Sequence, residues 1–231
     1  MTKQSAEIAR GVARWIFKSI VYTVIFGLAL FAPSGDLGWT WGWGYLAIYI
    51  INQVILTVIL PPDLLSERST AQEGSKAWDL VLASVAALFM PIATYIVAGF
   101  DHGKAWSGTL SPIVQILALV VMLGGIAMSD WAMVANRFFS GLVRIQADRG
   151  QTVQTGGPYR FVRHPGYVGG ILHHIAAPLM LGSWWALIPG CIGALLFVIR
   201  TALEDKTLQG ELSGYVEYTQ QTRYRLMPGV W

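Results

Sequence analysis

Long apolar runs separated by short polar segments dominate the hydrophobic pattern of this chain. A helix needs about 20 apolar residues to cross a bilayer core of roughly 30 Å. Four runs meet this requirement, at residues 15–32, 41–60, 78–100 and 111–135. Two shorter runs, 168–182 and 184–200, are separated only at Ser183 and predict a short helical hairpin. The pattern therefore predicts an all-α integral membrane protein with about six transmembrane helices.

The fifth run is short for a full span, which leaves open a re-entrant segment or a helix kinked at Pro178. Residues 61–77 form a polar loop in which we expect a short interfacial helix, and residues 136–167 form the longest polar connection. Residues 201–222 return to helical spacing and predict an amphipathic cytoplasmic helix that continues from the last span. Its apolar side would carry Leu203, Leu208, Leu212 and Tyr215.

Composition agrees with a membrane location. The chain has 231 residues, 54% of them hydrophobic and only 13% charged, whereas a soluble domain carries about 25% charged residues. Many of the tryptophans lie near the ends of apolar runs, where aromatic belts form at membrane interfaces. The single cysteine, Cys191, excludes an intramolecular disulfide and a cysteine metal cluster. The net charge of +3 does not indicate nucleic-acid binding, because the basic residues fall between the apolar runs.

The distribution of Lys and Arg predicts the orientation, because cytoplasmic loops are enriched in these residues. With six crossings and the N-terminus inside, every Lys and Arg except Lys104 falls on the cytoplasmic side. Both termini are therefore expected in the cytoplasm. The first apolar run follows a basic start, as in a signal peptide, but no small-x-small cleavage site follows it. We expect an uncleaved first helix.

The stretch with the most chemical information is 156–167, which reads Gly-Gly-Pro-Tyr-Arg-Phe-Val-Arg-His-Pro-Gly-Tyr. Proline fixes φ and disfavours helix in the residue before it, so this segment is stiff and non-helical. It holds Arg163, His164 and Tyr167 at the mouth of the predicted hairpin. Two interpretations remain open at this point: a ligand-binding turn, or a basic loop that caps a span and contacts lipid phosphates.

Arg200 and Glu204 form a second constellation, since residues four apart share one face of a helix. The pair could be an exposed ion pair of little energetic weight. Alternatively, Arg200 could bind a carboxylate through two hydrogen bonds, and Glu204 could accept from a ribose hydroxyl or an ammonium group. The adjacent Asp205 is expected to face elsewhere and to be solvated.

Several other polar residues are expected to have structural roles. His173 and His174 lie within the fifth apolar run and are interpreted as packed, hydrogen-bonded histidines, with no third ligand at a spacing that suits a metal. Asn52 and Gln53 are expected to bind one helix to another. Asp130 is a better functional candidate, because a buried acid near a membrane is costly. Three small residues, Gly124, Gly125 and Ser129, are expected to permit close helix packing.

Taken together, these motifs resemble the isoprenylcysteine carboxyl methyltransferase family. The resemblance consists of Gly-Pro-Tyr-Arg-x-x-Arg-His-Pro-x-Tyr-x-Gly at 157–169, Arg-x-x-x-Glu at 200–204, Tyr215 with Tyr218, and Arg225 with Pro228. It covers roughly residues 111–231, and the compact chain is similar to microbial members. We therefore expect a methyltransferase core at 111–231 within a single structural domain, preceded by transmembrane helices of unassigned role at 1–110.

The resemblance implies S-adenosylmethionine as the methyl donor. By position, the donor-binding residues would be Gln151, Thr152, Val153, Gln154, Tyr159, His164, Pro165, Gly166, Tyr167 and Glu204. Gln146 is a further match upstream, and Gln151 stands where eukaryotic members usually have a histidine. Arg200 corresponds to the family's substrate-binding arginine and is expected to act in catalysis by holding the acceptor. No metal is implied.

Methyl transfer from a sulfonium mainly requires that donor and acceptor be positioned, so these residue types suit the reaction. We expect a membrane-embedded enzyme that acts at the cytoplasmic side on a lipophilic small-molecule or prenylated acceptor in contact with the bilayer, without nucleic acid. A thiol or phospholipid acceptor remains an alternative. From a different class, a nicotinamide-dependent membrane enzyme resembling sterol reductases also remains, as does a non-catalytic scaffold or transporter. The sequence leaves the oligomeric state open.

Overall fold

The computed structural model describes residues 3–231, so the first two residues of the predicted N-terminal region lie outside the described part. Within that part the chain forms helices and turns without a strand. The α-helices are α1 (Lys3–Ser34), α2 (Thr40–Ile59), α3 (Pro62–Ser69), α4 (Ala77–Ser84), α5 (Met90–Lys104), α6 (Pro112–Ala135), α7 (Pro165–Met180), α8 (Leu187–Glu211) and α9 (Tyr215–Gln221). Three short elements complete the fold: η1 (Val85–Phe89), η2 (Ala147–Arg149) and η3 (Gly157–Arg160). The prediction of an all-α protein is confirmed.

Five helical segments are long and apolar enough to cross a membrane: α1, α2, the continuous segment 77–104, α6 and α8. Their outer faces carry large exposed apolar side chains such as Phe17, Val58 and Ile113, which a surface facing water would rarely gather so densely. Helix α7 has 16 residues and at 1.5 Å per residue is about 24 Å long. The fifth apolar run is therefore a complete helix that is shorter than a typical span.

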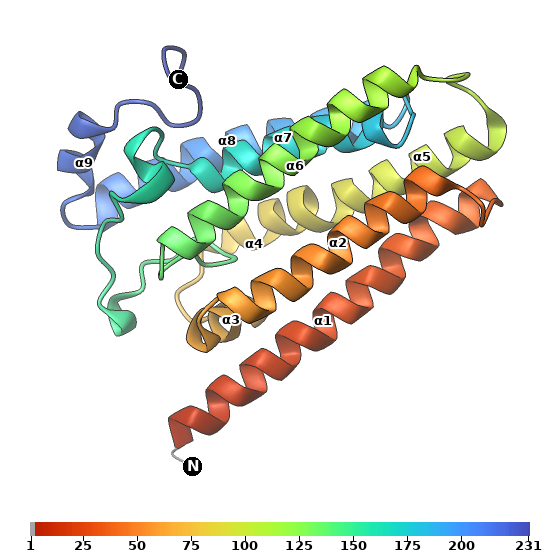
Figure 1. The fold of residues 1–231 in the computed structure, drawn as a ribbon. Coiled ribbons are helices and arrows are strands. Elements are labelled where there is room, and N and C mark those ends of the chain that lie inside the picture. The colour runs from red at the N-terminus through yellow and green to blue at the C-terminus, as the bar shows by residue number, and fades with distance from the viewer. Residues whose placement is uncertain (1–2) are drawn as a thin grey trace.

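In Figure 1 the long helices run along one bundle, and the chain ends both lie toward the end that carries α3 and α9. We call this end, with residues 61–76, 136–164 and 212–231, the motif end. The opposite end, the turn end, carries the connections 35–39, 105–111 and 181–186. The two ends differ in construction, because the turn end has short connections whereas the motif end holds the long polar segment between α6 and α7.

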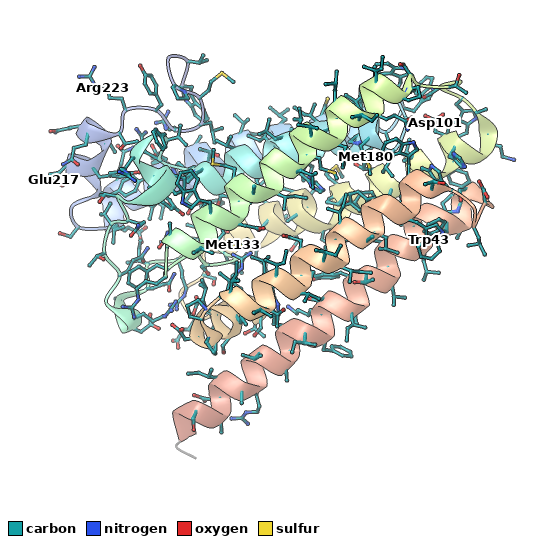
Figure 2. The ribbon with its side chains drawn as sticks, viewed as in Figure 1. Trp43, Asp101, Met133, Met180, Glu217 and Arg223 are labelled. Atoms are coloured by element: carbon teal, nitrogen blue, oxygen red, sulfur yellow. The ribbon has the colours of Figure 1, made fainter. Side chains whose placement is uncertain are left out.

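A buried acid ties the connections together at the turn end. Asp101 accepts a hydrogen bond from the Ser107 N–H at 2.6 Å and further bonds from the hydroxyls of Ser107 and Ser183. In Figure 2, Trp43 and Asp101 mark this end, whereas Glu217 and Arg223 mark the motif end. The carboxylate of Asp101 therefore has a structural use far from the motif residues.

Helices α6 and α7 pack closely because small residues face each other where they cross. A Cβ atom added to Gly125 would lie 2.8 Å from the Gly169 carbonyl oxygen, and one added to Gly169 would lie 2.2 Å from the Gly125 carbonyl oxygen. The Ser129 hydroxyl donates to the Gly166 carbonyl at 3.1 Å. The packing role predicted for Gly125 and Ser129 is confirmed. That for Gly124 is wrong, because a Cβ atom there would meet nothing within 4 Å.

The intramembrane polar residues join helices, as expected. The Ser19 hydroxyl donates to Oε1 of Gln53 at 3.2 Å, which links α1 to α2. The Asn52 side chain interacts with the Asp130 carboxyl, which links α2 to α6. The predicted role of Asn52 and Gln53 is confirmed.

Helix α4 passes into α5 through η1, a π-helical turn, and such turns often occur at functional sites. His174 lies against this turn, with Nε2 3.0 Å from the Ala86 carbonyl oxygen. His173 Nε2 lies 3.1 Å from the Tyr45 hydroxyl, which also bonds the Tyr95 hydroxyl. Both histidines are packed and hydrogen-bonded, as predicted.

The predicted amphipathic helix at 201–222 is only partly correct. Helix α8 continues without a break to Glu211, and the chain then turns through Gly214, whose φ of 81° is left-handed, before α9 begins. Three of the predicted apolar positions, Leu208, Leu212 and Tyr215, pack together at the motif end. Leu203 does not join them and is exposed. The left-handed Gly214 changes the direction of the chain between α8 and α9, so residues 201–222 cannot form one continuous helix.

Candidate functional site

A partly open cavity of about 280 Å³ lies at the motif end, close to the lower limit of about 300 Å³ for small-molecule pockets. Nine of the ten predicted donor-binding residues line it: Gln151, Thr152, Val153, Gln154, Tyr159, His164, Gly166, Tyr167 and Glu204. Arg200 lines it too. Pro165 does not line the cavity. It is the first residue of α7, a position where the backbone N–H that proline lacks would have no partner within the helix. The structure brings these residues together, while their individual roles stay predictions.

The polar connection that forms one side of the cavity is held by ion pairs to α3. Arg144 binds Glu67 through two hydrogen bonds, Nε to Oε1 at 2.9 Å and Nη2 to Oε2 at 3.0 Å. Arg149 Nη2 binds Asp63 Oδ2 at 2.7 Å. The first 110 residues carry no recognisable motif, yet they hold this wall of the cavity in place.

The predicted donor strip 151–154 begins where a glutamine pair fixes the loop. The Gln146 N–H donates to Oε1 of Gln151 at 2.7 Å, and the Gln146 side chain donates to the Phe138 carbonyl at 2.7 Å. Arg149 Nη1 donates to Oε1 of Gln146 at 2.6 Å. The side-chain oxygen and nitrogen of Gln146 are thereby both bonded within the loop. The side-chain nitrogen of Gln151 stays available to a ligand in the cavity.

Tyr159 lies in η3 and is held by its neighbours. Its hydroxyl accepts from Asn136 Nδ2 at 3.3 Å and donates to the Ala132 carbonyl at 3.4 Å. Its own carbonyl accepts from the Tyr218 hydroxyl at 2.7 Å. Burial raises the pKa of the Tyr159 phenol, so the group stays protonated at neutral pH and can act only as a hydrogen-bonding and packing group.

The expectation that Asp205 is solvated is wrong, because its side chain is fully buried. It accepts from Arg163 through Nε at 2.7 Å and Nη2 at 3.0 Å, and from Arg225 Nε at 2.8 Å. The Tyr215 hydroxyl lies 3.1 Å away and His164 Nε2 lies 3.2 Å away. Buried charge is tolerated where it is paired and hydrogen-bonded in this way.

The C-terminal tail explains why local spacing could not reveal this burial. The Arg163 N–H donates to the Tyr224 carbonyl at 2.9 Å, and the His164 N–H donates to the Arg225 carbonyl at 3.0 Å. The tail therefore lies alongside the motif turn and covers Asp205. The carboxylate fixes the orientation of His164 toward the cavity wall.

Glu204 contacts the motif turn directly, because the Tyr167 hydroxyl donates to its Oε2. The Tyr167 ring lies parallel to the His164 ring at 5.7 Å between centroids, and the Arg200 guanidinium lies 5.1 Å from the centre of the Tyr167 ring. These four side chains form one layer, in which an arginine charge, two rings and a carboxylate are in contact. A carboxylate beside aromatic rings suits a cationic ligand.

Arg200 does not pair with Glu204, which was one of the two interpretations of their spacing. Its Nε donates to Asp79 Oδ1 at 2.6 Å and its Nη2 to Asp79 Oδ2 at 2.7 Å. Nη2 also donates to the Gly141 carbonyl at 2.9 Å. Both partners of this ion pair are buried. The pair links α4 to α8 and places the Arg200 side chain at the cavity.

Another wall of the cavity is apolar and belongs to the bundle helices. Ala87 from η1, Met133 from α6, Gly170 from α7 and Phe197 from α8 all line it. In Figure 2, Met133 lies between the motif end and the middle of the bundle. The cavity therefore combines a polar side, built from the motif residues, with a side suited to hydrocarbon.

Sequence reasoning missed three charged residues of this site, Arg68, Arg144 and Asp79. Arg68 lines the cavity from α3, and Asp79 holds Arg200. Asp79 gave one usable signal, since an acid at the start of an apolar run is a functional candidate. Arg68 lies in a short polar loop and gave none. Asp130, the acid favoured from the sequence, does not line the cavity.

The chemistry of the lining suits the predicted donor. S-adenosylmethionine combines a flat base, a ribose and a positively charged sulfonium, and the cavity offers tyrosine rings, amide groups and the Glu204 carboxylate. Among residues 3–231, no three His, Cys, Asp or Glu side chains are grouped to hold a metal ion.

A comparison with family models matches residues 116–210 to the isoprenylcysteine carboxyl methyltransferase (ICMT) family. The matched segment runs from within α6 through the polar connection and α7 to nearly the end of α8. It includes every predicted donor-binding residue and Arg200, and it leaves out Arg68 and Asp79. A comparison with curated proteins found no match. Residues 116–210, which carry the motif turn and most of the cavity lining, thus match the ICMT family, as the motifs of the sequence had indicated.

Proposed function

We propose that this protein transfers a methyl group from S-adenosylmethionine to a lipophilic acceptor within the cavity at the motif end. One observation carries the proposal: a single cavity is lined both by nine predicted donor-binding residues and by apolar side chains of the bundle helices. The ICMT family supports methyl transfer as the reaction class. The identity of the methyl donor and the lipophilic class of the acceptor are the parts of the proposal that go beyond this reaction class.

On the donor side, Glu204 would accept from the amine or a ribose hydroxyl, since a carboxylate offers strong acceptor oxygens. Tyr167 holds that carboxylate through its hydroxyl, and Asp205 holds His164 in the adjacent turn. Bound S-adenosylmethionine would supply a methyl group on a cationic sulfur, and on transfer the carbon–sulfur bond breaks with its electron pair left on sulfur. The residues of the chain need only position the two reactants.

On the acceptor side, Met133 and Phe197 would hold a hydrocarbon chain, because burial of apolar surface favours such a ligand. A carboxylate acceptor, as in prenylated cysteine, needs no general base, because its oxygen already carries the reacting electron pair. The role of Arg200 in holding the acceptor stays a prediction. Its Nε and Nη2 are engaged by Asp79, so any contact would use Nη1.

We propose that the motif end faces the cytoplasm and that the termini lie on the same side. The distribution of basic residues in the sequence supports this orientation. Both chain ends lie toward the motif end in Figure 1, as the proposal requires. S-adenosylmethionine is made in the cytoplasm, so the donor would reach the cavity directly.

Calorimetric titration of the purified protein in detergent with S-adenosylhomocysteine tests the donor assignment. We expect saturable binding by the wild type and at least about tenfold weaker binding by Glu204→Ala, the loss expected for a hydrogen bond to a charged group. Glu217→Ala is the matched control, because Glu217 is an exposed glutamate at the same end of the molecule. Saturable binding of a nicotinamide dinucleotide in place of S-adenosylhomocysteine would favour the reductase-like class and overturn the proposal.

A further inference from the structure

Four arginines line the cavity, and three of them use the same edge of the guanidinium group to bind a carboxylate. Nε and Nη2 of Arg144 bind Glu67, those of Arg163 bind Asp205, and those of Arg200 bind Asp79, with all six distances between 2.6 and 3.0 Å. This two-point geometry is the preferred arrangement for arginine with a carboxylate. Three of the four arginine charges in the cavity wall are therefore paired with carboxylates of the same chain.

Arg68 is the exception among these four arginines. Its Nη1 donates to the carbonyls of Phe139 at 3.2 Å and Ser140 at 3.3 Å. Its Nε is buried without a hydrogen-bond partner, and none of the described carboxylates lies within salt-bridge distance of the guanidinium. Asp130 acts on Arg68 only at longer range. A buried donor left without a partner is costly, so this edge calls for a ligand.

The charge state of Arg68 agrees with such a role. Burial and the neighbouring Arg200 charge lower the pKa of Arg68 to about 10. The side chain is therefore still a cation at neutral pH, but its charge is less stable than that of an exposed arginine. An anion bound at this edge would offset both the cost of burying the charge and the repulsion from Arg200.

We propose that Arg68 binds the anionic head of the methyl acceptor, a carboxylate, through the Nε and Nη2 edge. This inference rests on the proposed function and names a specificity-determining residue of the same cavity. A carboxylate at Arg68 would complete the same two-point pair that the other three arginines already form. Arg200 then acts as a positioning residue that is paired within the chain, and Arg68 supplies the charge that selects the acceptor.

The surroundings of Arg68 favour the acceptor over the donor as the source of the carboxylate. The guanidinium lies 5.0 Å from the centre of the Phe139 ring and 5.9 Å from that of Trp15. Both rings pack against the apolar cluster that includes Leu64 and Met133, and Met133 lines the cavity. The anion held here would therefore belong to a ligand with a long adjoining hydrocarbon chain, which the donor lacks.

A carboxylate bound in this way remains able to react. Each carboxylate oxygen has two lone pairs, and the guanidinium occupies only one on each oxygen. In the transfer, a free lone pair of one oxygen forms the bond to the methyl carbon while the methyl–sulfur bond breaks and its electron pair stays on sulfur. The products are a methyl ester and a neutral thioether, and no proton is moved. The ester has lost its negative charge, so Arg68 would hold it less tightly than the acceptor.

The test compares two probes, N-acetyl-S-farnesylcysteine and its uncharged carboxamide, by calorimetric titration of the detergent-solubilised protein saturated with S-adenosylhomocysteine. We expect the wild type to prefer the carboxylate by about ten- to a hundredfold, the range for a charge-assisted pair. Arg68→Gln should bind both probes equally, and Arg68→Lys should show an intermediate preference because an ammonium lacks the two-point geometry. Arg14→Gln, an exposed arginine of α1, should behave as the wild type.

S-adenosylhomocysteine affinity, measured for each variant, separates the possible failures. Unchanged affinity in Arg68→Gln shows that the variant is folded and supports the acceptor assignment. An equal fall in S-adenosylhomocysteine affinity would place the donor's own carboxylate at Arg68 and overturn it. A carboxylate preference that survives in Arg68→Gln would also overturn it, as would a wild type that binds S-adenosylhomocysteine but neither probe. A wild type that fails to bind S-adenosylhomocysteine would instead contradict the proposed function.

Discussion

Arg200 and Asp79 form a buried two-point ion pair across 121 positions of sequence. The pair joins α8, which belongs to the family segment, to α4, which lies outside it. Asp79 also accepts from the Val143 N–H at 2.6 Å, so the same carboxylate holds the polar connection. The N-terminal helices are thus part of the structure that positions the site.

Removal of Asp79 should destabilise the protein strongly, because it leaves the Arg200 charge buried and unpaired. Such a loss costs about 3–5 kcal/mol, or roughly 6–20 °C in melting temperature for a chain of this size. Thermal unfolding of Asp79→Ala in detergent measures it. Asp63→Ala, which removes a more exposed ion-pair partner of Arg149, should lower the melting temperature by far less. Similar losses in the two variants would show that the buried pair is not a major source of stability.

Asp205→Asn should weaken S-adenosylhomocysteine binding. Asparagine keeps the shape of the side chain but loses the charge that pairs with Arg163 and Arg225 and faces His164. We expect about a tenfold or larger rise in the dissociation constant, as for loss of a hydrogen bond to a charged group. Calorimetric titration measures it. Asp148→Asn is the control, since the Asp148 side chain is 62% exposed and lies outside the cavity lining. Wild-type affinity in Asp205→Asn would mean that Asp205 does not position the donor turn.

Two adjacent glycines of α6 should respond differently to alanine. Gly125→Ala places a Cβ atom 2.8 Å from the Gly169 carbonyl oxygen, so α6 and α7 must move apart and the melting temperature should fall by several degrees. Gly124→Ala meets nothing within 4 Å, and alanine is the better helix former, so its melting temperature should equal or exceed that of the wild type. Thermal unfolding of both variants in one detergent decides the point. An unchanged melting temperature for Gly125→Ala would show that the crossing tolerates a wider separation.

Topology can be tested with single cysteines in a Cys191→Ser background. Lys104 at the turn end and Gln220 at the motif end are both exposed. If the motif end faces the cytoplasm, an impermeant thiol reagent added to intact cells should label Lys104→Cys. It should label Gln220→Cys only after the membrane is made permeable. Labelling of Gln220→Cys in intact cells would contradict both the orientation and the cytoplasmic location of the site.

The class of the protein and the motif residues of the cavity lining could be predicted without a structure. Run length and low charge predict membrane helices, because the bilayer sets a minimum apolar length. The stiff turn at 156–167 and the shared helix face of Arg200 and Glu204 were predictable because proline restrictions and helical spacing act between near neighbours. The donor-binding roles of these residues were implied by the family resemblance. The separation of the fifth and sixth apolar runs at Ser183 indicated the α7–α8 hairpin for the same reason, since short connections join adjacent helices.

The pairing of the charges became visible only in the folded chain. Asp205 looked solvated because its partners Arg163 and Arg225 come from the motif turn and from a tail that folds back, and no local spacing encodes that contact. Arg200 has a nearer acid at Glu204 in the sequence, yet its partner is Asp79 on another helix. Long-range pairing depends on which elements the packed bundle brings together. For the same reason the unpaired edge of Arg68 became visible only when the other three cavity arginines were seen with their carboxylates.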